Sequence, residues 1–209
     1  MEYTFLHHEK IDGDDTIFLY IDNVLPEELL VKTKYWLERK TYKDGYCIDG
    51  KEIPRKQIWF HKDNKYFCKE WKYRYKRWES EQYDELLEEV ETFIKHTLQE
   101  ITTTIDGIDI PDINSCLVNK YRDGRDSIKP HSDSALSFGD YPTITNLSFG
   151  DTREFIIKRK KKKDRITIEL KDNSMLIMAG GSQKYFTHQI TKSDSEFIRY
   201  SMTFRQHLD

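Results

Sequence analysis

The sequence predicts an α+β fold in which helices pack against one side of a double-stranded β-helix, or jelly roll. Helical periodicity dominates the first half of the chain, whereas short β-rich segments follow one another from about residue 114. No helical pattern separates these segments, so the sequence favours an antiparallel sandwich or barrel over a parallel sheet. The 209 residues suit one domain. We predict this single domain over 1–209, with the helices within about 1–112 and the jelly-roll core at about 113–206.

The first half of the chain contains two helical patterns. After Pro26, acidic residues occupy a first helical turn, and apolar side chains then recur on one face. A stronger 3.6-residue period follows, with Ser80 as its expected N-cap and acidic residues that suit the positive end of the helix dipole. The two apolar faces consist of Leu29, Leu30, Trp36 and Leu37, and of Leu86, Leu87, Val90, Phe93, Ile94, Thr97, Leu98 and Ile101.

Six strands are expected after these helices, because β-branched and aromatic residues are concentrated in short segments there. Gly, Asp and Pro residues or a lysine run separate each segment from the next. In chain order the segments read SCLVNKY, TITNLSF, REFIIK, RITIEL, SMLIMA and FIRYSMTFR. The chain has no internal repeat and no Pro/Gly/Ser-rich linker that would mark a domain boundary.

The charges are segregated along the chain. A net charge of −3, from 34 Lys and Arg against 37 Asp and Glu, excludes a uniformly basic coat for nucleic acid. Seven of the eight residues in 158–165 are basic, and 55–78 combines nine Lys or Arg with eight aromatic residues. The second zone suits phosphate contact with base stacking, although ordinary core aromatics would give the same pattern. The lysine run is more typical of a solvated hairpin tip.

Composition excludes several classes of protein. No apolar run approaches the roughly 20 residues of a membrane span, and the N-terminus lacks the pattern of a secretion signal. Three cysteines without a C-x-x-C pair argue against a disulfide framework and a zinc knuckle. We therefore expect an intracellular protein, in the nucleus or cytoplasm and not secreted, with no membrane partner. We also expect a monomer.

The segment His131-Ser132-Asp133 and the distant His188 form a pattern that is typical of a catalytic metal site. Residues two apart on a strand point to one face, so His131 and Asp133 can bind the same ion. Two imidazoles and one carboxylate can hold one face of an octahedral Fe(II) and leave three positions for a cosubstrate and O2. The H-x-D triplet alone is a weak signal, because this chain has 7 His.

An arginine-containing row follows His188 after eleven residues. On a strand, one inward face would carry Arg199, Ser201, Thr203 and Arg205. Two inward guanidinium groups would destabilise the fold without an anionic partner. A dicarboxylate such as 2-oxoglutarate, bound by a bidentate arginine, is a natural partner. The alternative is a salt bridge to one of the protein's own carboxylates.

Longer motifs surround these residues. They are NKYRDGRDSIKPHSD at 119–133, RYSMTFR at 199–205, PRKQ at 54–57 and YRY at 73–75. They resemble, respectively, the N-x-Y-x-D-G…H-x-D segment, the closing motif, the start of the substrate-recognition lid and the Tyr-x-aromatic element of the AlkB-type nucleic-acid demethylases. The eukaryotic-type DNA repair homologues are the most similar, and the resemblance runs in order from about residue 50 to 205.

The resemblance implies a dioxygenase that uses Fe(II), 2-oxoglutarate as cosubstrate and O2 to repair N-alkylated bases in DNA or RNA by oxidative demethylation. It also implies an N-terminal nucleotide-recognition lid within about 1–112, beside the supporting helices. The catalytic metal ligands would be His131, Asp133 and His188. The contacts to 2-oxoglutarate would be Asn119, Tyr121, Arg199, Thr203 and Arg205. The contacts to the substrate would be Arg55, Trp59, Tyr73, Tyr75 and Ser134.

Two departures from the family pattern bear on the substrate. Ser134 and Ala135 follow H-x-D, where repair enzymes usually carry an acid near the amino group of the base. Residues 46–50 also lack the bulky apolar pair with which duplex-repairing relatives fill a vacated stack. Single strands are therefore the expected substrate, since they cost least to unstack. Two other functions remain open: a catalytically inactive nucleic-acid-binding module of the same fold, and an oxygenase that acts on protein side chains.

Overall fold

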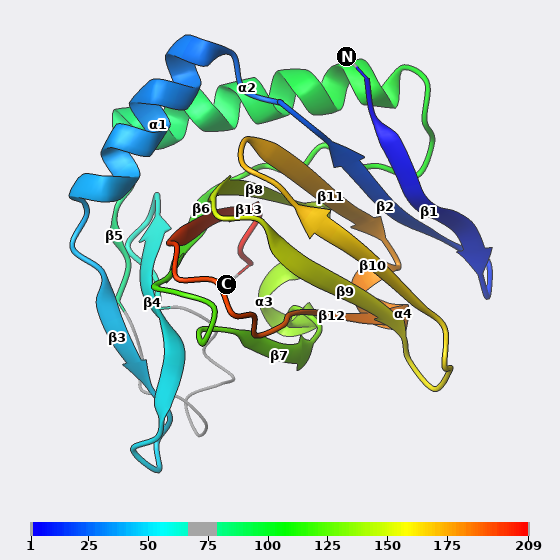
Figure 1. Ribbon diagram of the computed structural model, residues 1–209. Helices are drawn as coiled ribbons and strands as arrows, with labels where there is room; N and C mark the ends of the chain where they lie inside the picture. The colour runs from blue at the N-terminus through cyan, green and yellow to red at the C-terminus, as the bar shows by residue number, and fades with distance from the viewer. Residues whose placement is uncertain (1, 67–78, 209) are drawn as a thin grey trace.

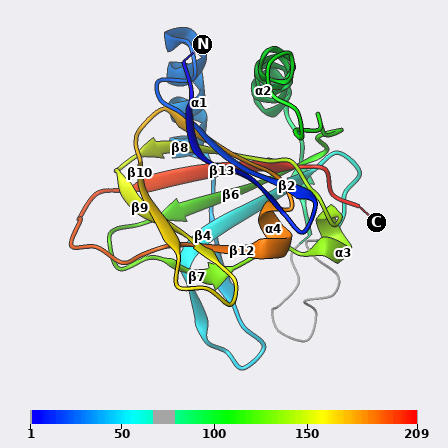
Figure 2. The same cartoon turned by 90° about the vertical axis from the view of Figure 1, so that its right-hand side faces the viewer.

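The computed structural model describes residues 2–66 and 79–208. In this part of the chain two β-sheets face each other, and two long helices cover the outer side of the larger sheet (Figure 1). Figure 2 shows the same order of layers from the side: helices, larger sheet, smaller sheet. The predicted α+β jelly-roll architecture is confirmed.

The larger sheet has nine strands among the described residues, in the order β1-β2-β11-β8-β13-β6-β4-β3, with β5 beside β4. These strands are β1 (Thr4–Ile11), β2 (Asp14–Ile21), β3 (Lys43–Tyr46), β4 (Glu52–His61), β5 (Glu81–Gln82), β6 (Ser115–Tyr121), β8 (Ile144–Gly150), β11 (Ser174–Gly180) and β13 (Arg199–Arg205). The smaller sheet, in the order β10-β9-β12-β7, consists of β10 (Arg165–Leu170), β9 (Arg153–Arg159), β12 (Phe186–Ile190) and β7 (Ile128–His131). Antiparallel pairing holds both sheets together, and β5 joins β4 in parallel.

The two long helices are α1 (Glu27–Arg39) and α2 (Glu85–Thr102), and both lie over the larger sheet (Figure 1). Two one-turn helices, α3 (Ala135–Phe138) and α4 (Ser182–Tyr185), lie close to β7 and β12, respectively, in the chain. Among the described residues, no helix has both the length and the apolarity that crossing a bilayer requires.

The helix starts agree with the sequence in one case and differ in the other. α1 begins directly after Pro26, as predicted. α2 is capped by Asp84 instead of the predicted Ser80, because the Asp84 carboxylate accepts a hydrogen bond from the Leu87 N–H at 3.2 Å. The short strand β5 separates Ser80 from the helix.

Side-chain alternation divides the apolar core into two parts. On β13, Tyr200, Met202 and Phe204 join the larger cluster, which also contains the buried faces of α1 and α2. A second cluster, which includes Phe18 and Ile157, combines residues of both sheets. Because helices cover one face of the central strands and the smaller sheet covers the other, β13 is buried along its whole length.

The six strands predicted in the second half are confirmed as β6, β8, β9, β10, β11 and β13, each within two residues at its ends. β7 and β12 are not among the six predicted segments, although the H-x-D argument placed His131 on a strand or its end and required a strand for the third ligand. The β7 sequence IKPH contains a proline, and the β12 sequence FTHQI places a buried histidine where an apolar residue would complete the pattern.

The prediction of a mostly helical first half is wrong, because β1 to β5 all lie there. β1 and β2 form a hairpin whose two-residue turn, Asp12-Gly13, has φ angles of 51° and 92°. An Asp-Gly turn with two positive φ angles suits the twist of antiparallel strands. This turn is the signal that the helical interpretation overlooked. β2 pairs with β11 and β4 pairs with β6, so strands from both halves build one sheet.

Candidate metal and cosubstrate site

A cavity of about 110 Å³ lies between the two sheets. Strands β4, β6, β8, β11 and β13 line it from the larger sheet, and β7, β9 and β12 line it from the smaller one. On β13, the residues that line it are Arg199, Ser201, Thr203 and Arg205, which is the inward row that alternation predicts. The two arginines stand at opposite ends of this strand.

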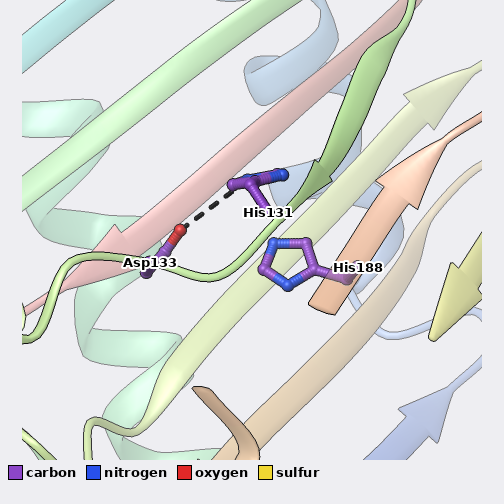
Figure 3. Close-up of side chains that lie close together, drawn as sticks. All are labelled: His131, Asp133 and His188. Atoms are coloured by element: carbon purple, nitrogen blue, oxygen red, sulfur yellow. Dashed lines mark ion pairs between the residues drawn. The ribbon is translucent and has the colours of Figure 1, made fainter. Parts of the chain in front are cut away.

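The structure brings His131, Asp133 and His188 together at this cavity. Each residue offers one possible ligand atom, and these atoms lie within 4.8 Å of one another. His131 ends β7 and is the direct pairing partner of His188 on β12, which places the two ring centroids 4.3 Å apart. Asp133 follows in the turn before α3, and Figure 3 shows its carboxylate directed toward the His131 ring. The side chains can therefore surround one ion.

Both histidines have surroundings that suit metal ligation. The His131 Nδ1 atom lies 2.9 Å from the Lys129 carbonyl oxygen, so Nδ1 carries the proton and donates it. The Nε2 atom, which lies 3.9 Å from the Asp133 carboxylate, is then the available ligand. Burial and the neighbouring His131 lower the pKa of His188 to about 3, and burial also lowers the pKa of His131. Both imidazoles are thus neutral near pH 7, the form that binds metals.

The Asp133 carboxylate is held by a buried ion pair. Its Oδ2 accepts a hydrogen bond from the Arg205 Nε at 2.6 Å, and the two side chains are only 5% and 7% exposed. Burial raises the pKa of Asp133, but Arg205 and the two histidines lower it by more, so the pKa lies below its usual value. The carboxylate is therefore ionised, with Oδ1 facing His131. This oxygen can bind a hard cation while Arg205 fixes the other.

Arg199 has a different environment at the other end of β13. Its side chain is 1% exposed, its Nη2 donates to the Ser148 Oγ at 2.8 Å, and its guanidinium lies 5.0 Å from the centre of the Tyr121 ring. Within residues 2–66 and 79–208, its Nε and Nη1 have no hydrogen-bond partner. Burial also lowers the pKa of Arg199, with Tyr121 offsetting part of that effect. A buried guanidinium with unused donors fits a carboxylate of a bound ligand.

The remaining predicted cosubstrate residues line the same cavity between these two arginines. Asn119 pairs directly with Ser201 across β6 and β13, and its Nδ2 donates to the Ser201 Oγ at 3.3 Å. Thr203 accepts a hydrogen bond from the Asn146 Nδ2 at 2.8 Å. Tyr121 is buried beside Arg199. The pairing register of β6 and β13 therefore determines which polar side chains lie next to one another in the cavity.

The predicted substrate-contact residues differ in their location relative to the cavity. Arg55 lines the cavity itself, where its Nε donates to the Asn119 Oδ1 at 3.0 Å and its Nη1 to the Ser127 carbonyl at 3.2 Å. Ser134 is the N-cap residue of α3 and does not line the cavity. The predicted Tyr73 and Tyr75 lie outside the described residues.

The expectation that Trp59 contacts the base needs correction. Its side chain is 2% exposed, and its indole N–H donates to the Lys65 carbonyl at 3.3 Å. The ring packs against His61 and His207, with centroids 5.9 and 5.5 Å away. A base cannot stack on this ring, because neighbouring side chains already cover it.

Sequence reasoning missed two polar residues of β8. Asn146 lines the cavity, and the Oγ of Ser148 accepts the Arg199 hydrogen bond. They stand two apart in the strand ITNLSFG, and this spacing could have marked an inward polar face. Gln57 was also missed, although its Nε2 donates to Asn119 at 2.9 Å.

The chain also matches a protein-family model and several curated proteins. The family model of the 2OG-Fe(II) oxygenase superfamily matches residues 18–205. The chain is 38% identical over 102 residues to the alpha-ketoglutarate-dependent dioxygenase alkB homolog 3 of Mus musculus, and this match covers 44% of the chain and 36% of the relative. It is 29% identical over 116 residues to the DNA oxidative demethylase ALKBH2 of Arabidopsis thaliana, covering 44% of the chain and 37% of the relative. The match thus spans little more than a third of each relative.

A solved structure, that of OsALKBH1, has a similar fold. It aligns with a TM-score of 0.63 over 91% of this chain and 96% of that chain, at 14% sequence identity. This likeness concerns the backbone architecture.

Proposed function

The chain belongs to the 2OG-Fe(II) oxygenase superfamily, and from that membership we propose that it is an Fe(II)- and 2-oxoglutarate-dependent dioxygenase that removes alkyl groups from the bases of DNA or RNA. The similar curated proteins are a dioxygenase and a DNA oxidative demethylase, which supports this substrate class. One observation carries the proposal. A single cavity joins a cluster of two histidines and a carboxylate to a buried arginine, two of whose nitrogens have no hydrogen-bond partner among the described residues.

In this proposal His131, Asp133 and His188 hold the iron. The Lys129 carbonyl orients the His131 ring so that Nε2 is the ligand, and Arg205 occupies the Asp133 Oδ2 so that Oδ1 is the ligand. When bound, Fe(II) lets O2 oxidise 2-oxoglutarate to succinate and CO2 and hydroxylate the alkyl carbon, and a hydroxylated N-methyl group then leaves as formaldehyde. The residues of the chain hold and orient the reactants and keep bulk water away.

Arg199 binds the distal carboxylate of 2-oxoglutarate in this proposal. Its Nη1, which has no hydrogen-bond partner among the described residues, supplies a charge-assisted donor for this carboxylate, while the Ser148 Oγ keeps Nη2 in place. Asn119 and Thr203 contribute polar groups along the cavity between Arg199 and the metal cluster. Arg205 also faces the cavity, and its Nη1 has no hydrogen-bond partner in the part of the chain that the structure describes. It can therefore help to bind the carboxylate nearer the metal.

The nucleic acid would contact the outside of the smaller sheet as well as the cavity mouth. A surface groove there is lined by Lys158, Lys163 and Arg165, and its lining also includes His188, so basic side chains lie close to the metal cluster. Exposed cations of this kind bind phosphates without regard to sequence. We further propose that the protein prefers single strands and acts as a monomer, in the nucleus or the cytoplasm.

The test is turnover with a defined oligonucleotide. The protein is loaded with Fe(II) without oxygen and then receives O2, 2-oxoglutarate and a single strand that contains 1-methyladenine or 3-methylcytosine. We expect equal amounts of succinate and formaldehyde, and much less of both with the unmethylated strand of the same sequence. Binding of the strand without succinate would indicate an inactive binding module. Succinate that forms only with protein substrates would indicate a protein oxygenase.

A further inference from the structure

The turn that carries Asp133 leaves the sheet directly after His131, so no strand ladder holds it. Instead, two hydrogen bonds to residues outside the cavity hold the turn in place. The Ser132 Oγ donates to the Phe186 carbonyl at 2.7 Å, and the Asp133 N–H donates to the Gln183 Oε1 at 2.9 Å. Asp133 is thus held at both ends, by Gln183 at its backbone and by Arg205 at its carboxylate, since Arg205 Nε lies 2.6 Å from Oδ2.

Gln183 is itself fixed in place. It belongs to α4, is only 6% exposed, and its Nε2 lies 3.6 Å from the Met178 Sδ and 3.4 Å from the Ser182 Oγ. These contacts orient the amide so that Oε1 is the acceptor for the Asp133 N–H. The residue before the helix, Gly181, donates its N–H to the Asp15 carbonyl at 2.7 Å.

Two hairpins hold α4 against the sheets. From the β1–β2 hairpin, the Asp14 carboxylate accepts hydrogen bonds from the Lys184 Nζ and the Tyr185 hydroxyl, both at 2.8 Å. From the β9–β10 hairpin, the Lys160 Nζ donates to the Gln183 carbonyl at 2.9 Å. Lys160, which lies within the basic run of residues 158–165, therefore has a structural contact beside the turn that carries Asp133.

We propose that Gln183 is a positioning residue for the metal centre. By accepting from the Asp133 N–H, it fixes the backbone of the turn so that the carboxylate stays opposite His131 and His188. This inference rests on the proposed function, because it requires that Asp133 binds a metal. Partners that orient metal ligands typically change affinity by about 10- to 100-fold when removed.

The experiment measures binding of Mn(II), without 2-oxoglutarate or O2, by titration calorimetry. In Gln183→Leu, which has similar volume but no acceptor, we expect binding to weaken about 10-fold or more. In Gln183→Glu, which keeps an acceptor oxygen, we expect an affinity within about threefold of the wild type. Lys184→Met is the matched control, because it removes one charged contact of α4 while Tyr185, Gly181 and Lys160 still hold the helix, and Lys184 does not contact Asp133. Its affinity should equal that of the wild type.

The outcomes separate the inference from the function on which it rests. Equal Mn(II) affinities for the wild type and Gln183→Leu would overturn the role of Gln183, as would an equal loss in Lys184→Met and Gln183→Leu. A wild type that does not bind Mn(II) would contradict the metal site itself. If Gln183→Leu does not fold, Gln183→Asn replaces it, since the shorter amide draws the acceptor away from Asp133. An unchanged affinity in that variant would overturn the inference as well.

Discussion

Arg199 and Arg205 face one cavity from opposite ends of one strand, yet their surroundings differ. Arg205 forms a 2.6 Å ion pair with Asp133, whereas Arg199 donates to the Ser148 hydroxyl and keeps two buried nitrogens without a partner among the described residues. Both are almost fully buried, so burial alone does not separate them. One buried cation therefore stabilises the turn that carries Asp133, while the other suits the anionic group of a bound ligand.

The largest effect on activity is expected from substitution of the three predicted metal ligands. His131→Ala, Asp133→Ala and His188→Ala should each abolish metal binding and turnover, because three ligands leave no redundancy. Asp133→Ala should also lower the free energy of unfolding by about 3–5 kcal/mol, because Arg205 then remains buried without its partner. Iron occupancy and thermal unfolding check both statements. Full occupancy and activity in any one variant would contradict the assignment of the ligands.

At the Arg199 end, Arg199→Ala should mainly raise the apparent KM for 2-oxoglutarate. Removing a desolvated, charge-assisted hydrogen bond costs about 2–4 kcal/mol, or roughly 30- to 1000-fold. Arg199→Lys keeps the charge but not the planar fork and should fall between the two. Initial rates at varied 2-oxoglutarate concentrations provide the measurement. An unchanged KM in Arg199→Ala would mean that this arginine serves a protein carboxylate after all.

A smaller effect, on the affinity for Mn(II), should distinguish the roles of the two arginines directly. Arg205→Lys should weaken Mn(II) binding about 10-fold, because the Nε hydrogen bond that orients Asp133 is then missing. Arg199→Lys is its matched control and should bind Mn(II) as the wild type does, since Arg199 contacts none of the proposed ligands. Titration calorimetry compares the two variants. Equal decreases in affinity would show that the two ends of the cavity are coupled.

The smallest effect is expected for cations outside the cavity. Changing Lys161, Lys162 and Lys163 to Ala should weaken binding of single strands uniformly across sequences, and the log–log salt slope should shift by roughly 0.7 for each phosphate that the variant no longer neutralises. The KM for 2-oxoglutarate and the Mn(II) affinity should stay unchanged. Lys32→Ala on α1 is the control, because Glu28 and Glu89 already pair with that lysine. Salt titrations that superimpose on the wild type would identify the run as a solvated turn.

The predictable parts of the fold are those governed by local periodicity. The α2 pattern could be read from its 3.6-residue repeat, and the second-half strands from their short segments of β-branched and aromatic residues, of which RYSMTFR also alternates. The β1–β2 hairpin was missed, although its Asp12-Gly13 turn is a strong signal, because its outer strand is largely exposed and lacks a clear apolar face. Trp59 was misjudged because its basic, aromatic neighbourhood resembles a binding surface, and burial depends on elements far away in the chain.

Sequence alone showed which chemistry the imidazoles and carboxylate of H-x-D and His188 offer, because this follows from the atoms of each residue. For the row from Arg199 to Arg205 it also showed a shared face, because that row lies on one strand. Asp133 lies beyond the end of β7, so strand alternation does not place its carboxylate. The partners of these side chains came from the tertiary structure alone. Arg205, and not Arg199, meets Asp133 across 72 residues, and Gln183 reaches the same residue across 50. Such contacts depend on sheet register and on the path of loops, which a local repeat does not encode.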